Sequence, residues 1–138
     1  MYRLFEICVR FLEWMGNTFH ITYQQISVYI NLYLQGGVLV ISTVPALIMA
    51  IAHKNPLWIV ITALNTWLHS FGFAWMMMHY RLPQNINFAF NLCVDDLLLL
   101  AQRWHITYQQ VNIVIFVIGF LLLLGINLGI CWIMKNQL

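Results

Sequence analysis

The residue best suited to chemistry in this sequence is a histidine in the middle of an apolar stretch. His69 lies within TALNTWLHSFGFAW, and Asn65 and Thr66 precede it by four and three residues. Residues at these spacings share one face of a helix. An ionisable side chain at bilayer depth indicates a binding or transport site. The alternative is a neutral histidine whose ring bonds a neighbouring helix, because polar contacts between spans are themselves stabilising.

A second polar face occurs earlier in the chain. Its residues recur every three or four positions and are Gln24, Ser27, Asn31 and Gln35. The wall of a water-filled path needs hydrogen-bonding groups, so this face and the His69 face are the candidate lining of a pore. The alternative is that both faces join helices, within one chain or between copies of it.

Sulfur and imidazole groups gather where Met76 to Met78 precede His79. Such ligands suit copper(I), but consecutive residues on a helix point in different directions, so three methionines cannot share one metal ion. The cysteines are far apart and have neither zinc nor disulfide spacing; they are Cys8, Cys93 and Cys131. We expect no metal site and no cofactor.

No enzyme motif is present in the sequence. Asp95 and Asp96 are adjacent, so they fall on different faces of a helix and are unsuited to sharing a substrate. The chain has no glycine-rich phosphate loop, no HExxH zinc motif and no nucleophile elbow. We therefore expect no enzymatic activity.

The composition indicates an integral membrane protein. Hydrophobic residues make up 62% of the chain and charged residues 7%, against about a quarter charged residues in soluble domains. Three apolar stretches, at 23–52, 57–79 and 108–134, each exceed the ~20 residues that cross a bilayer. The formal net charge of +2 is carried by scattered residues and does not favour binding to nucleic acid.

Two further segments, 2–15 and 87–103, are predicted to be amphipathic helices. Their polar residues fall on one side and their apolar residues mostly on the other. This periodicity is typical of a helix that lies in the membrane interface. The same helices could instead pack on the protein's own spans, and a helix in the interface could do both.

The hexapeptide HITYQQ occurs twice, at 20–25 and at 105–110. Under the same offset of 85 positions, Cys8 aligns with Cys93 and the two amphipathic segments coincide. This predicts an internal repeat of an interfacial helix, a corner and a spanning helix. The predicted parts of the chain are repeat 1 at 1–52, a returning span at 57–79 and repeat 2 at 86–138.

We interpret the hexapeptide as a structural corner. A threonine followed three residues later by a glutamine is a capping box, and the two boxes are Thr22 with Gln25 and Thr107 with Gln110. A helix that begins at a membrane surface must satisfy its free N–H groups, because lipid offers no partner. The alternative is a ligand site built from the two histidines of the hexapeptides, His20 and His105.

The predicted fold is all-α and polytopic, with three transmembrane helices and two amphipathic interfacial helices in a tandem, parallel repeat. Both corners begin at the same membrane face, so 57–79 returns between them. Arg10 and Asp95 hold equivalent positions in the two repeats and are expected to pair. The corner face carries four arginines and the opposite face two lysines, which favours the corner face as cytoplasmic. The N-terminus is then on the cytoplasmic side of the plasma (inner) membrane. The arginines are Arg3, Arg10, Arg81 and Arg103, and the lysines are Lys54 and Lys135.

The leading functional hypothesis is a small homo-oligomeric membrane protein that forms a pore or channel-like assembly. Three spans bury little surface among themselves, so their polar faces require partners, and a ring of copies would have rotational symmetry. The expected partners are the lipid bilayer and either copies of this chain or other membrane subunits. The alternatives are a non-catalytic accessory or anchoring subunit of a larger membrane complex and a holin-like lysis pore.

Overall fold

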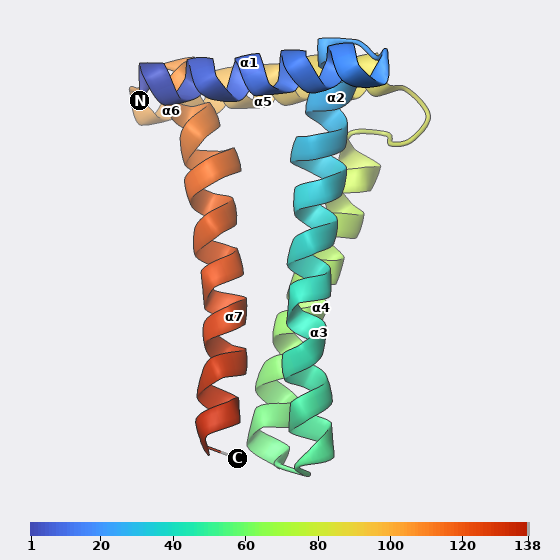
Figure 1. The fold of residues 1–138 in the computed structure, drawn as a ribbon, viewed down its shortest axis with the longest axis vertical. Coiled ribbons are helices and arrows are strands. Elements are labelled where there is room, and N and C mark those ends of the chain that lie inside the picture. The colour runs from blue at the N-terminus through green and yellow to red at the C-terminus, as the bar shows by residue number, and fades with distance from the viewer. Residues whose placement is uncertain (138) are drawn as a thin grey trace.

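Three long helices stand upright and two others cross one end of them, in a computed structural model that describes residues 1–137 (Figure 1). The crossing helices are α1 (Tyr2–Phe19) and α5 (Ile86–Trp104). The upright helices are continuous runs of the following elements: α2 (Tyr23–Val28), η1 (Tyr29–Leu34) and α3 (Gln35–Ala52) in the first, α4 (Pro56–His79) as the second, and α6 (Tyr108–Ile113), η2 (Val114–Gly119) and α7 (Phe120–Gln137) in the third.

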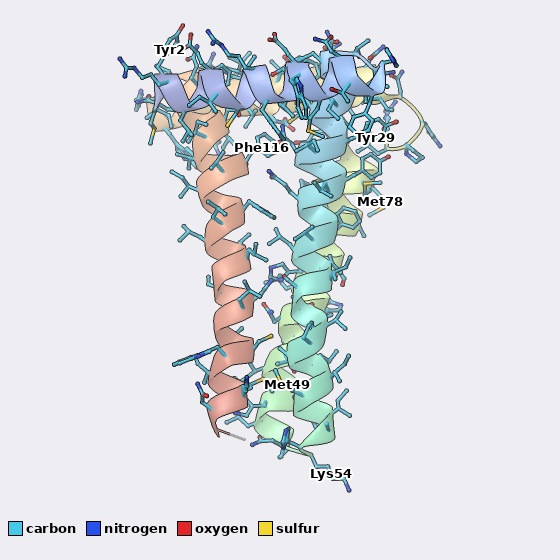
Figure 2. The ribbon with its side chains drawn as sticks, viewed as in Figure 1. Tyr2, Tyr29, Met49, Lys54, Met78 and Phe116 are labelled. Carbon is cyan, nitrogen blue, oxygen red and sulfur yellow. The ribbon has the colours of Figure 1, made fainter. Side chains whose placement is uncertain are left out.

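The upright helices have the length and composition of membrane spans. They cover Tyr23–Ala52, Pro56–His79 and Tyr108–Asn136. The shortest has 24 residues, which at ~1.5 Å per residue exceeds the ~30 Å hydrocarbon core of a bilayer. Figure 2 labels Tyr2 at the end crossed by α1 and Lys54 at the opposite end. The three upright helices are therefore long and apolar enough to cross a membrane, and the crossing helices lie at one end of them.

The ends of the helices differ from the predicted boundaries for local reasons. α1 continues four residues past the predicted end and stops at His20, where a φ of 55° ends the helix in the left-handed region. α4 begins at Pro56, because Asn55 Oδ1 accepts a hydrogen bond from the backbone of Trp58 at 3.2 Å. α7 continues to Gln137, beyond the predicted end at residue 134.

Residues 2–52, the first half, and residues 87–137, the second half, follow the same course 85 positions apart. α2 and α6 begin at Tyr23 and Tyr108, and the π-helical turns η1 and η2 coincide under the same offset. The sequence pattern did not predict these turns. A π turn bonds each N–H to the carbonyl five residues back, which rotates the helix that follows relative to the helix before.

The two halves also exchange equivalent contacts. The ring of Phe5 meets Tyr108 edge to face with centroids 6.1 Å apart, and the ring of Phe90 meets Tyr23 in the same way at 6.0 Å. The interplanar angle is 81° in both pairs. Phe90 and Tyr108 stand 85 positions after Phe5 and Tyr23, so the two contacts join the same pair of positions under that offset.

α4 packs closely on α3. A Cβ atom added at Gly36 would lie 2.5 Å from the ring of Phe73, so the absence of a side chain there allows the two helices to meet. At the far end the buried residues Ala46 and Ala50 of α3 contact Met134 of α7. Six further buried residues form two small clusters near the crossing helices: Val28, Leu32 and Ala89, and Leu97, Ala101 and Val111.

Candidate functional site

Each corner is closed by a reciprocal pair of hydrogen bonds. Gln25 N donates to Thr22 Oγ1 at 3.3 Å, and Thr22 N donates to Gln25 Oε1 at 3.0 Å. Gln110 and Thr107 make the same bonds at 3.2 and 2.8 Å. Two free N–H groups at the start of each span are thereby satisfied within the corner itself.

The two corner histidines do not form one site. His20 and His105 are both exposed, and both take left-handed backbone conformations that end the preceding helix. His20 ends α1 beside α2, and His105 ends α5 beside α6, which stand on opposite sides of the molecule (Figure 1). These positions serve to stop one helix so that the next can begin.

Polar side chains of all three spans meet at Asn127, which is 1% exposed. Asn127 Nδ2 donates to Ser42 Oγ at 2.8 Å and to Leu39 O at 3.3 Å. Asn127 Oδ1 accepts from Asn65 Nδ2 at 3.0 Å. Ser42 and Asn127 are 85 positions apart, so equivalent positions of the two halves face each other here. We call these four residues the asparagine hub; it joins the three spans by hydrogen bonds within one chain.

Nearer the crossing helices, the polar face of the first span turns toward the second half. Asn31 and Gln35 line a cavity of about 190 Å³ that also includes Asn112 of α6. Ser27 lines a smaller cavity with Asn31 and Asn112, and Asn31 Nδ2 donates to Ser27 Oγ at 3.2 Å. Figure 2 labels Phe116, which lines both cavities, between the spans just beneath α1.

Two other residues of the predicted lining lie elsewhere. Gln24 is exposed at the corner. Thr66 Oγ1 donates to Thr62 O of its own helix at 2.9 Å. The polar faces are therefore divided among the asparagine hub, the cavities beneath α1, and bonds within α4.

His69 bonds its own helix and no neighbouring one. Its Nδ1 lies 2.9 Å from Asn65 O, one turn earlier in α4. Its Nε2 is buried and has no hydrogen-bond partner within the described part of the chain. The ring lies at a cavity of about 360 Å³ to which α3, α4 and α7 contribute.

A cluster of ionisable side chains lies where the C-terminal end of α4 meets α5. His79 Nε2 is 3.0 Å from Asp96 Oδ2, and Tyr80 Oη donates to the same oxygen at 3.1 Å. The ring of Trp75 stacks on His79 with centroids 5.0 Å apart. Together with Arg103 these residues line a recess of about 480 Å³.

Burial keeps the neighbouring weak acids of this cluster neutral. Burial raises the pKa of the Cys93 thiol to about 11, and the charge of Asp96 acts in the same direction. Burial, with Cys93 and Asp96 nearby, also raises the pKa of Tyr80. The Tyr80 phenol is therefore a hydrogen-bond donor to Asp96 across the physiological range.

No pattern in the sequence predicts this cluster. His79 and Asp96 are 17 residues apart and lie on different helices, so no periodicity relates them. The one signal available was the pair of adjacent acids, since one of them must lie nearer the apolar side of an amphipathic helix.

The predicted pairing of Arg10 with Asp95 does not occur. Within residues 1–137 the contact of salt-bridge geometry joins His79 to Asp96. Arg10 lies in a recess with Glu6 and Glu13, while Asp95 is exposed. The reason is that Asp96, about 100° around the helix from Asp95, is the acid that faces α4.

Methionine and histidine do not gather into a metal site at the end of α4. Met76 lines the His69 cavity, Met78 is 68% exposed, and His79 is paired with Asp96. Among the described residues, no three histidine, cysteine or acidic side chains are grouped as metal ligands would be.

The chain matches no protein-family model, no curated protein and no solved structure. Its function is therefore argued from its own geometry.

Proposed function

We propose that the two halves are a tandem repeat of one unit, made of a surface-lying helix, a corner and a spanning helix. The units are related by an axis along the membrane normal, as in other parallel repeats. Support comes from the equal spacing of the caps and π-helical turns, from the reciprocal aromatic contacts, and from Ser42 facing Asn127.

In this proposal α1 and α5 lie in the membrane interface. Four large apolar residues of α1 recur at helical spacing and are more than two-fifths exposed; they are Leu4, Ile7, Phe11 and Trp14. A stripe of this kind enters the acyl region while the polar side faces water. The excess of arginine on this face makes it cytoplasmic and puts the N-terminus inside the plasma (inner) membrane.

The function that we propose is that of a non-catalytic accessory or anchoring subunit in a larger membrane complex. The observation that carries it is the asparagine hub. The side-chain amide of Asn65 donates to Asn127, and the amide of Asn127 donates to Ser42 and Leu39 of α3. Polar faces used in this way hold one chain together and are not available to line an axis between copies.

The outer surface agrees with this role. Along α4 the exposed residues are large and apolar, and Trp67 stacks on Phe71 with ring centroids 5.4 Å apart. Such a surface is suited to lipid chains and to the spans of other subunits. The surface-lying helices would fix the depth of the chain in the bilayer.

A pore remains the second candidate, favoured by the cavity beneath α1 that Asn31, Gln35 and Asn112 line. The path would run from the corner face between the two halves to the asparagine hub. At the far end, Met134 packed on Ala46 and Ala50 would close it. A homo-oligomeric ring or a holin-like pore would instead require these polar faces to turn outward.

One experiment separates the two candidates. The purified chain is placed in lipid nanodiscs for mass measurement and in liposomes for ion and small-solute flux. An accessory subunit is a single chain with flux equal to protein-free liposomes. A closed ring of copies, or flux that Asn127→Leu changes, would establish the pore and reject the accessory role.

A further inference from the structure

One nitrogen of the His69 ring, Nε2, has no hydrogen-bond partner within residues 1–137. A carbonyl oxygen can only accept, so the 2.9 Å contact with Asn65 O requires Nδ1 to carry the proton. The neutral ring then has its lone pair on Nε2, which is buried and unpartnered within residues 1–137. The atom is thus a hydrogen-bond acceptor that lacks a donor.

The ring that carries this acceptor lines an apolar cavity of about 360 Å³, which is within the size range of small-molecule sites. Besides His69, the walls are hydrocarbon, a phenyl ring and a thioether, supplied by Leu39, Leu68, Phe73, Met76 and Leu123, with glycines at 36 and 72. All three spans contribute to it. No wall residue offers an O–H or N–H group to the ring.

The position of the cavity limits what can enter. His69 is 13 residues after Pro56 and 10 residues before His79 in α4, so it lies ~20 Å and ~15 Å from the two ends of the helix. In a bilayer this position lies near the middle of the hydrocarbon layer, where the acyl chains of the two leaflets meet. A ligand must therefore be dissolved in the hydrocarbon layer, and it must bring its own donor.

We propose that this cavity binds a lipid-soluble phenol or quinol, whose hydroxyl donates to His69 Nε2 when a flexible wall side chain moves aside to uncover that buried atom. An aromatic ring suits the wall, because Phe73 offers ring contacts and Met76 offers a sulfur that packs well on aromatic edges. A phenolic hydroxyl is a strong donor, and imidazole nitrogen is a good acceptor. The site is independent of the accessory role, since an anchoring subunit and a pore could both carry it.

The test uses the full chain in nanodiscs with ¹⁵N-labelled histidine rings. The probes are 4-hexylphenol and its methyl ether, 4-hexylanisole; both carry the hexylphenyl group, and the ether replaces the hydroxyl hydrogen, the donor, with a methyl group. We expect the phenol to move the Nε2 resonance of one histidine and to bind about tenfold more tightly than the ether. His69→Phe should remove that resonance and make the two affinities equal, while His53→Phe, in the exposed turn after α3, should leave both results unchanged.

Three outcomes would overturn the proposal. These are equal binding of phenol and ether to the wild type, a resonance shift at a histidine other than His69, and an Nε2 resonance already hydrogen-bonded without any probe. The last result would show that water or a second copy of the chain supplies the donor. If His69→Phe does not fold, the labelled wild type with the two probes still decides the question.

Discussion

The first and second halves share a backbone course but differ in the side chains of their spans. α3 carries small residues where it packs on its neighbours, namely Gly36, Ala46 and Ala50. The counterparts in α7 are Leu121, Cys131 and Lys135. Thr43 of α3 is 1% exposed, whereas its counterpart Leu128 is 56% exposed. The α3 surface is shaped for a close neighbour, and the α7 surface is suited to lipid.

The crossing helices α1 and α5 also differ in how far their side chains are buried against α4 and the spans. Ala89 of α5 is fully buried, and Asp96 bonds the end of α4. Their counterparts in α1 are Leu4 and Phe11, which are 41% and 52% exposed. The corner therefore depends on local residues, since the same hexapeptide forms the same capping box at both places in the chain. The attachment of α4 is a separate property, and it depends on small residues in α3 and an acid in α5.

The largest effect is expected when α3 is given the side chain of α7 at its tightest contact. Gly36→Leu installs the residue found at position 121 and forces it into the Phe73 ring. Overpacking of this kind destabilises by about 2–3 kcal/mol, to be measured by reversible unfolding in mixed micelles. The matched control is Gly37→Leu, which installs the residue of position 122 where nothing lies within 4 Å. Equal effects of the two substitutions would contradict close packing of α4 on Gly36.

Asn127→Leu breaks the contact between equivalent positions of the halves. Ser42 and Asn65 lose a partner, and a loss of about 1–2 kcal/mol is expected for buried polar bonds between spans. Exchanging the pair, as Ser42→Asn with Asn127→Ser, should recover part of this loss, because the contact across the axis is restored while the bond to Asn65 is not. An exchange variant no more stable than Asn127→Ser alone would count against the hub.

The next effect concerns the cluster that α5 forms with the end of α4, to which α1 contributes no residue. With Cys8 and Cys131 replaced by serine, maleimide labelling of Cys93 at pH 8 should be about 100-fold slower than for a thiol of pKa 9, since each pKa unit changes the thiolate fraction tenfold. Asp96→Asn should speed the labelling, because the charge of Asp96 helps to raise this pKa. Asp95→Asn, at an exposed neighbour, is the control and should have no effect.

The same pKa shift gives the sign of a stability change. The folded protein favours the neutral Cys93 thiol, so this contribution is complete below the ordinary thiol pKa near 9 and is lost as the pH rises through about 11. The raised pKa of Tyr80 acts in the same direction. The melting temperature should therefore fall between pH 9 and 11, and a flat profile there would argue against burial of these groups.

The smallest difference is expected between the two corners. Thr22→Ala and Thr107→Ala should each cost about 1 kcal/mol, which is typical of a lost N-terminal cap. The two losses should agree within a few tenths of a kcal/mol, because the hydrogen bonds are alike in both corners. A clear inequality would mean that packing around a corner, and not its own bonds, sets its stability.

Much of the architecture could be predicted because it depends on local or periodic signals. The apolar length of Tyr23–Ala52 identifies a span without any knowledge of its neighbours. Thr22 and Gln25 lie three residues apart, so their bonds form within one turn. The π-helical turns could not be predicted, since Tyr29–Leu34 has no composition that separates it from ordinary helix.

The sequence by itself determined which segments form helices long and apolar enough to cross a membrane and where the two capping boxes lie, because each of these depends on residues near one another along the chain. Only the tertiary structure decided that Asn127 meets Ser42 and Asn65, that Asp96 and not Asp95 faces α4, and that His69 is left with a free acceptor. Those outcomes depend on the rotation of one helix relative to another. That rotation is set by contacts between residues tens of positions apart, which no local pattern records.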